Sequence, residues 1–286
     1  MARILLCSLL GVMSLFGADT ATNYAKEIAD FRAARERSIS GPDGWSTVVG
    51  LAWLKEGLNR VGSDPDSEVA LPAWVPARVG TIIVKAKQAE FRPSPGVKIP
   101  AQALKEDTTI LTIGSVKFFL IERAGKFAVR VKDADAPTRK EFTHLSWYPP
   151  DPAWRIEGKF VPWDKPRTIK FDTVIEGVAE EDQSPGYVTF TKDAHEYRLD
   201  AVVDEGELFL IFRDQTSGKT TYPAARFLYA EAPKKLTAPA PVVLDFNKAI
   251  NPPCVFTAYA TCPLPPPQNR LTLAIPAGEL MYNNHR

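Results

Sequence analysis

The last third of the chain carries most of the polar side chains whose types could do chemistry. Arginine forks onto carboxylates and asparagine both donates and accepts hydrogen bonds, so together they can hold a small polar or acidic ligand or a glycan. Ligand binding is therefore the first function that the sequence predicts. The candidate ligand-binding residues are Thr216, Tyr222, Arg226, Asn247, Asn251 and Asn269, with Arg139 from the middle of the chain.

Three carboxylates in the same region suggest a second function. Asp214, Asp245 and Glu279 are candidate acids or bases of a hydrolase, since paired carboxylates are the minimum for glycoside-type hydrolysis. A third alternative is a structural or interaction module of the cell envelope, because loop Asp and Asn bond their own backbone and Arg–Asp pairs latch strands together. Convergence of the polar side chains on one concave pocket would favour a site over a structural role.

Other motifs give weaker signals. Gly218-Lys219-Thr220 matches the end of a phosphate-binding loop, but Arg213 stands where that loop needs its first glycine. His144, His195 and His285 have no second His or Cys at short ligand spacing, and no Gly-x-Ser-x-Gly elbow occurs. The sequence therefore predicts neither a metal nor a cofactor.

The first eighteen residues have the layout of a secretory signal peptide. Arg3 precedes an apolar run from Ile4 to Phe16, and the small residues Gly17 and Ala18 follow. The run is shorter than the roughly 20 residues that a bilayer-spanning helix needs. We therefore expect cleavage after Gly17 or Ala18 and a periplasmic or secreted protein with no integral membrane segment.

The charge balance bears on possible partners. The chain has 35 basic and 34 acidic residues, and loss of Arg3 with the signal peptide leaves equal numbers. A neutral chain has no long-range attraction to phosphate backbones. Nucleic acid is therefore not an expected partner, whereas a small-molecule or glycan ligand is.

Two cysteines remain after signal removal, Cys254 and Cys262, in the proline-rich stretch 245–270. An even pair in an exported protein favours a disulfide, which would stabilise the chain by roughly 2–3 kcal/mol. A metal site would need two further ligands, and a catalytic thiol would need a His or a cationic neighbour. The disulfide is the favoured prediction among the three.

The elements that must position these groups are mainly β-strands. Residues 19–42 form the one clear helical pattern, with Tyr24, Ile28 and Phe31 on a single face. After it, short apolar runs separated by glycine or aspartate turns, such as those at Gly114-Ser115 and Gly125, predict antiparallel hairpins. The fold class is therefore mainly β, with antiparallel sandwich- or barrel-like units and one N-terminal helix.

The proline-rich segment at 148–152 suggests a boundary between two β-units. The predicted organisation is a signal peptide at 1–18, a helix at 19–42, a first β-unit at 43–148, and a second at 149–286 with a long proline-rich C-terminal loop. The first unit resembles the layout of a forkhead-associated sandwich. The resemblance implies topology alone, because Ser63 follows Gly62 where the phosphopeptide-binding members have an arginine.

Three blocks of sequence resemble the bacterial family called domain of unknown function 1684. They are "GWSTVVGLAWLKEGLNRVGSDP", "FRDQTSGKTTYPAARFLYA" and "VLDFNKAINPPCVFTAYATCPLPPPQNRLTLAIPAGE", which together extend from about Trp45 to Glu279. The resemblance implies no reaction. It does imply that certain residues belong to the family pattern: Asp214, Thr216, Gly218, Thr221, Tyr222 and Arg226 in one motif, and Asp245, Asn247, Asn251, Cys254, Cys262, Asn269 and Glu279 in the other.

Overall fold

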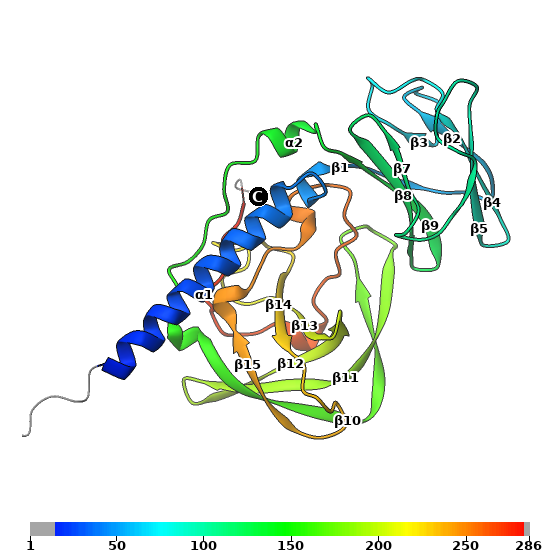
Figure 1. The fold of residues 1–286 in the computed structure, drawn as a ribbon. Coiled ribbons are helices and arrows are strands. Elements are labelled where there is room, and N and C mark those ends of the chain that lie inside the picture. Colours follow the sequence, from blue (N-terminus) through cyan, green and yellow to red (C-terminus); the bar gives the residue numbers. More distant parts are fainter. Residues whose placement is uncertain (1–14, 283–286) are drawn as a thin grey trace, which may run out of the picture.

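A computed structural model describes residues 15–282 of the chain and shows a mainly β protein with one long N-terminal helix (Figure 1). This confirms the predicted fold class. The predicted signal peptide lies largely outside the described residues, as does His285. Among residues 15–282, no helix is long and apolar enough to cross a membrane.

Helix α1 spans Leu15–Ser40 and lies across the second β-rich part of the molecule (Figure 1). The predicted apolar face is the docking face. Ile28 is buried, and the Phe31 ring meets Trp147 edge-on with 6.0 Å between ring centroids. The helix ends where Gly41 N donates to Arg37 O at 2.9 Å, just before a proline that cannot continue it.

The first β-unit consists of two sheets that share one core. One sheet has the order β1-β9-β8-β7 and the other β3-β2-β4-β5-β6, with β2 and β3 parallel and every other pair antiparallel. Phe91 of one sheet meets Phe118 of the other edge-on, 6.0 Å apart. The strands are β1 Val48–Trp53, β2 Gly57–Gly62, β3 Val69–Ala70, β4 Gly80–Lys85, β5 Gln88–Pro93, β6 Gln102–Leu104, β7 Ile110–Ile113, β8 Val116–Arg123 and β9 Lys126–Asp133, preceded by the 3-10 turn η1 Trp45–Thr47.

The turns of this unit follow from local sequence. Gly114, with φ +58°, and Ser115 join β7 to β8, and Ala124 and Gly125, with φ +51° and +72°, join β8 to β9. Both positions are the predicted hairpin turns.

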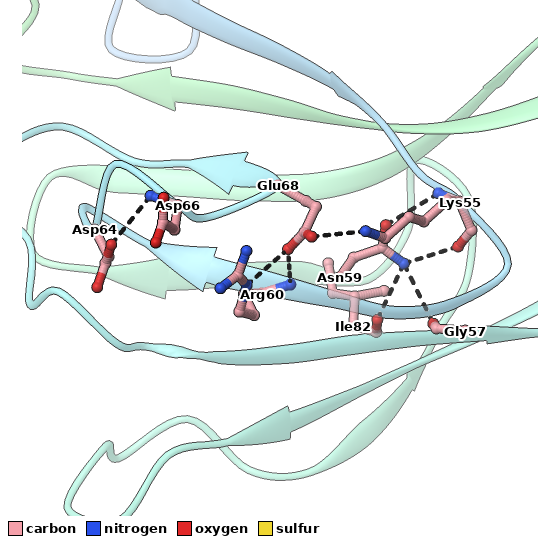
Figure 2. Close-up of polar contacts among 8 residues, drawn as sticks. All are labelled: Lys55, Gly57, Asn59, Arg60, Asp64, Asp66, Glu68 and Ile82. Atoms are coloured by element: carbon pink, nitrogen blue, oxygen red, sulfur yellow. Dashed lines mark hydrogen bonds and ion pairs between the residues drawn. The ribbon is translucent and has the colours of Figure 1, made fainter.

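Strand β2 carries polar contacts at its middle residues, Asn59 and Arg60 (Figure 2). Asn59 is fully buried and exchanges hydrogen bonds with Lys55 N and O at 3.0 and 2.9 Å. Glu68 accepts from Lys55 Nζ at 2.7 Å and from Arg60 N at 2.9 Å, so it ties the turn before β3 back onto β2 (Figure 2). These contacts leave no unpaired polar group that would indicate a ligand here.

The second β-rich part is a half-barrel of six antiparallel strands in the order β14-β13-β12-β11-β10-β15. Residues 167–172 of β10 pair with 179–184 of β11 beyond the rest of the sheet, so these strands extend as a two-stranded ribbon. The short α2 and η2 lead into this part. The elements are α2 Pro137–Lys140, η2 Pro152–Trp154, β10 Arg155–Asp172, β11 Ala179–Lys192, β12 His195–Asp204, β13 Glu207–Phe212, β14 Arg226–Glu231 and β15 Ala240–Asp245.

The two faces of the half-barrel have different roles. Leu208, Leu210 and Phe212 alternate along β13 with Phe209 and Ile211. The first three belong to the main core, and the other two belong to a smaller apolar cluster that also contains Phe171 and Phe227. The C-terminal coil 246–282, with the turns η3 Phe246–Lys248, η4 Pro253–Val255 and η5 Pro267–Asn269, packs on both clusters.

Candidate functional site

Asp214 and Arg226 form a buried ion pair at one end of the half-barrel core. Asp214 Oδ2 lies 2.6 Å from Arg226 Nη1, and the side chains are 0% and 1% exposed. Arg226 also donates to the carbonyls of Ile275, at 3.0 Å, and Ala277. The pair therefore fixes the C-terminal coil against β14.

The segment 214–221 is a closed turn. Thr216 N donates to Asp214 Oδ1 at 2.6 Å, and the hydroxyls of Thr216 and Thr221 are 2.9 Å apart. Gly218 has φ +81°, a value that favours glycine, and its N–H donates to Thr221 O at 2.9 Å. Because this N–H is used within the turn and no helix follows, the Gly218-Lys219-Thr220 match is not a phosphate loop.

Asp245 and Asn247 connect helix α1 to the half-barrel. Tyr24 Oη donates to Asp245 Oδ1 at 2.9 Å and accepts from Asn247 Nδ2 at 2.8 Å. Asn247 also exchanges two hydrogen bonds with the backbone of Asp151, at 2.8 and 2.9 Å. Burial, with the neighbouring Asp245 carboxylate, raises the pKa of Tyr24 above its ordinary value.

Glu279 and Asn251 form a second connection to α1. Asn251 Nδ2 donates to Glu279 Oε1 at 2.8 Å, and Arg35 Nε lies 3.3 Å from Glu279 Oε2. The Glu279 side chain is fully buried. Burial raises the pKa of this carboxyl, and the nearby Arg35 guanidinium only partly offsets the effect.

Asn269 and Arg139 belong to two further hydrogen-bond networks, separate from each other and from those described above. The Asn269 side chain exchanges hydrogen bonds with Asp200 N and O at 2.7 and 2.9 Å, and donates to Ile211 O at 2.9 Å. Arg139 donates to the carbonyls of Ser40 and Ala134, both at 2.9 Å. The three candidate catalytic carboxylates thus sit in three different internal networks, and the candidate binding residues use their polar groups to tie coil, strands and helix together.

Cys254 and Cys262 are free thiols in this structure, so the predicted disulfide is not formed here. They are nevertheless adjacent, since Cys254 N donates to Cys262 Sγ at 3.1 Å. A hydrogen bond from Cys262 lowers the pKa of the Cys254 thiol, whereas burial raises the pKa of Cys262. Tyr222 forms a hydrogen bond with Cys254, and burial raises the pKa of its phenol.

Among residues 15–282, no group of three or more His, Cys, Asp or Glu side chains could hold a metal ion.

A cavity of about 340 Å³ lies where the first β-unit meets the half-barrel, and we call it the junction cavity. Its apolar wall comes from β10, β13 and β14. Phe209 stacks on Tyr229 at 4.7 Å and meets Phe227 edge-on at 4.9 Å. The remaining lining includes Trp45 and Phe171, the coil residues Pro253, Ala260, Thr261, Cys262 and Pro263, and the charged residues Arg123, Arg130, Glu180, Asp182 and Asp204.

Arg130 is the exceptional residue of the junction cavity. It lies on β9 opposite Leu51 and Phe119, while its neighbours Val129 and Val131 point into the core of the first unit. The residue is only 6% exposed. Its guanidinium carbon lies 4.9 Å from the Trp45 ring centroid, and its buried Nε has no hydrogen-bond partner.

The charge of Arg130 is not matched by a direct partner. In the part of the chain that the structure describes, no carboxylate forms an ion pair with it and no acceptor receives its side-chain N–H groups. Burial lowers the pKa of Arg130 to about 10, so it remains charged at neutral pH. A buried, unpaired guanidinium is costly, which distinguishes this residue from the paired Arg226.

Acidic groups line another part of the junction cavity. Glu180 Oε1 is buried and accepts no hydrogen bond, but it forms an ion pair with Arg123, whose Nε lies 3.5 Å away. Burial raises the pKa of both Glu180 and Asp182. Tyr229 Oη donates to Asp204 Oδ2 at 3.2 Å. This site has no signal in the sequence, because Arg130 and Glu180 are single charges in two ordinary strands and only the packing of the two β-rich parts brings them to one cavity.

Fold and cavity together define a mainly β protein whose sandwich packs against a half-barrel closed by a long coil. The model of the family described as protein of unknown function (DUF1684) matches residues 140–280, and the chain belongs to that family. The match confirms the resemblance, although it begins after the first β-unit and not at Trp45. It contains every residue of the two predicted family motifs.

Comparison with solved structures finds several similar chains. The chain is similar to an uncharacterized protein from gene locus rrnAC0354 of Haloarcula marismortui, with 30% sequence identity and a TM-score of 0.44. The similarity covers 51% of this chain and 81% of that one. No curated protein matches the chain.

Proposed function

We propose that this protein binds a small amphipathic molecule with an anionic group in the junction cavity. The observation that carries the proposal is the buried Arg130 guanidinium, which has no ion-pair partner and faces an aromatic wall. An anionic group would supply the missing partner through charge-assisted hydrogen bonds, and an apolar body would pack on Phe209 and Phe227. The cavity volume of about 340 Å³ suits such a ligand.

The two other functions considered from the sequence have less support. A hydrolase built on Asp214, Asp245 and Glu279 would need two of these carboxylates to face one substrate, but each is engaged by its own partners. A purely structural module accounts for those networks. It gives no reason for a charged side chain such as Arg130 to be buried without a partner.

The experiment uses 8-anilinonaphthalene-1-sulfonate, an aromatic anion whose fluorescence rises in apolar sites. Arg130→Met keeps the length and apolar stem of the side chain but removes its charge. Loss of one charge-assisted interaction, worth about 1.5–3 kcal/mol, predicts at least about tenfold weaker binding of the dye. Arg92→Met is the matched control, because Arg92 is exposed on the same unit. Equal affinity of the dye for wild type and Arg130→Met would refute the proposal.

We also propose that the protein is exported, with the signal peptide at residues 1–18 removed and a Cys254–Cys262 disulfide formed in the periplasm or outside the cell. The side-chain contacts that dock α1 on the half-barrel, from Tyr24 to Arg35, follow the predicted cleavage position, so removal of the signal peptide leaves them intact. Mass spectrometry of the protein purified from the periplasm and medium should give a chain that begins at Ala18 or Asp19. An intact Met1 terminus on cytoplasmic protein would contradict export.

A further inference from the structure

The junction cavity holds two buried polar atoms of opposite charge that lack a hydrogen bond. Arg130 Nε and Glu180 Oε1 are both buried and both lack a hydrogen bond within the described residues. Both side chains line the cavity, but they form no ion pair with each other. Within residues 15–282, Arg130 has no charged partner, whereas Glu180 Oε1 is ion-paired with Arg123 at 3.5 Å but still accepts no hydrogen bond, so each atom can take a further bond from a ligand.

The overall charge of the lining also limits the ligand. Two basic side chains, Arg123 and Arg130, stand against three acidic ones, Glu180, Asp182 and Asp204, a formal balance of minus one. A ligand that carries only an anionic group would change the formal charge of the occupied cavity from minus one to minus two. A ligand with one group of each sign would leave it unchanged, and it would place a hydrogen-bond donor on the unsatisfied Glu180 Oε1.

A second, more open cavity continues from the acidic side. It has a volume of about 590 Å³ and shares Arg123, Glu180 and Asp182 with the junction cavity. It adds the acidic Glu122 and Glu181 against the single basic Lys170. The approach to Glu180 is therefore predominantly acidic, which favours a cationic group on that side of the ligand.

From these observations we infer that the ligand is an apolar zwitterion, a small molecule such as an amino acid or short peptide. Its carboxylate pairs with Arg130, its ammonium group is held by Glu180, and its apolar body lies against Phe209 and Phe227. Glu180 is a specificity-determining residue in this arrangement. The inference rests on the proposed function, since it names the ligand class of the same site.

Three probes separate the zwitterion from a simple anion: 3-phenylpropanoate, phenylalanine and 4-(aminomethyl)benzoate. Each is titrated against the dye-loaded mature protein to measure displacement. We expect at least one zwitterion to displace the dye at about tenfold lower concentration than 3-phenylpropanoate, as one additional charged hydrogen bond would give. The two zwitterions differ in the distance between their ammonium and carboxylate groups. Their order of affinity therefore indicates the distance between the Arg130 and Glu180 side chains in the complex.

The Glu180→Gln variant gives a second test, because it should change the affinities for the zwitterion and for the simple anion in opposite directions. The substitution should weaken binding of the preferred zwitterion about fivefold and strengthen binding of 3-phenylpropanoate, because it removes a negative charge from the cavity. Glu176→Gln, at the exposed turn of the same ribbon, is the control and should change neither. If Arg130 governs dye binding but the zwitterions compete no better than 3-phenylpropanoate and Glu180→Gln has no effect, the ligand class is wrong. If dye binding does not depend on Arg130, the proposed function itself fails.

Discussion

The Arg130 guanidinium carbon lies 4.9 Å from the centroid of the Trp45 ring, and no described carboxylate pairs with it. An arginine can stack on an aromatic face at modest gain, but stacking does not replace the hydration that burial removes. The contact therefore orients the side chain in the junction cavity without neutralising its charge. This relationship separates Arg130 from Arg226, the other buried arginine among residues 15–282.

Arg130→Met should raise the stability of the ligand-free protein. The substitution removes an unpaired buried charge and keeps most of the packing, so we expect the free energy of unfolding to rise by about 1–3 kcal/mol. Urea unfolding of the two mature proteins measures the difference. A large loss of stability would mean that Arg130 is satisfied within the protein, contrary to the proposed function.

Arg226→Met should have the opposite effect. It leaves the Asp214 carboxylate buried without a partner and frees the carbonyls of Ile275 and Ala277, so about 3–5 kcal/mol of stability should be lost. The same urea experiment measures it. The double variant Asp214→Asn/Arg226→Met should recover part of the lost free energy of unfolding. No recovery would show that the unpaired Asp214 carboxylate is not the main cause of the loss.

Glu279 predicts a pH dependence of stability. Because its folded-state pKa is raised, its favourable contribution is complete below the unfolded value, near 4.5, and is lost as pH rises through the folded value. Glu279→Gln should therefore flatten the fall in stability above about pH 4.5. Unfolding curves from pH 4 to 8 test this, with the exposed Glu196→Gln as control. If the free energy of unfolding falls with pH as steeply in Glu279→Gln as in the wild type, Glu279 is not the source of that fall.

The cysteine pair predicts an order of thiol reactivity. In the reduced protein Cys254, which is partly exposed and has a lowered pKa, should be alkylated before the buried Cys262. Iodoacetamide labelling followed by peptide mass spectrometry reads the order. Cys262→Ser should slow labelling of Cys254, because the hydrogen bond that lowers its pKa is weakened. Protein purified from the periplasm should take up no label until it is reduced, and label uptake without reductant would contradict the proposed disulfide.

Local patterns were sufficient to predict the elements of the fold. The turns at Gly114 and Gly125 specify hairpins through residues that tolerate positive φ, and the spacing of Tyr24, Ile28 and Phe31 specifies the docking face of α1. Such signals depend on neighbours in sequence. They do not depend on how the two β-rich parts pack.

The site could not be predicted in the same way. Asp214 and Arg226 have the composition of a binding site, and only the packing shows that they satisfy one another inside the core. Arg130 is one charge in the strand "KFAVRVKD", where alternation marks its face as solvent-exposed. That face is buried because the half-barrel covers it, and this long-range contact leaves no local trace.

The most direct test of the central claim is a crystal structure of the mature protein soaked with 3-(4-iodophenyl)propanoate, whose iodine is located by anomalous scattering. The proposal predicts an iodine peak beside Phe209 and Phe227 in the junction cavity, with the carboxylate within hydrogen-bond distance of Arg130. An empty junction cavity at saturating probe, or a carboxylate bound away from Arg130, would contradict it.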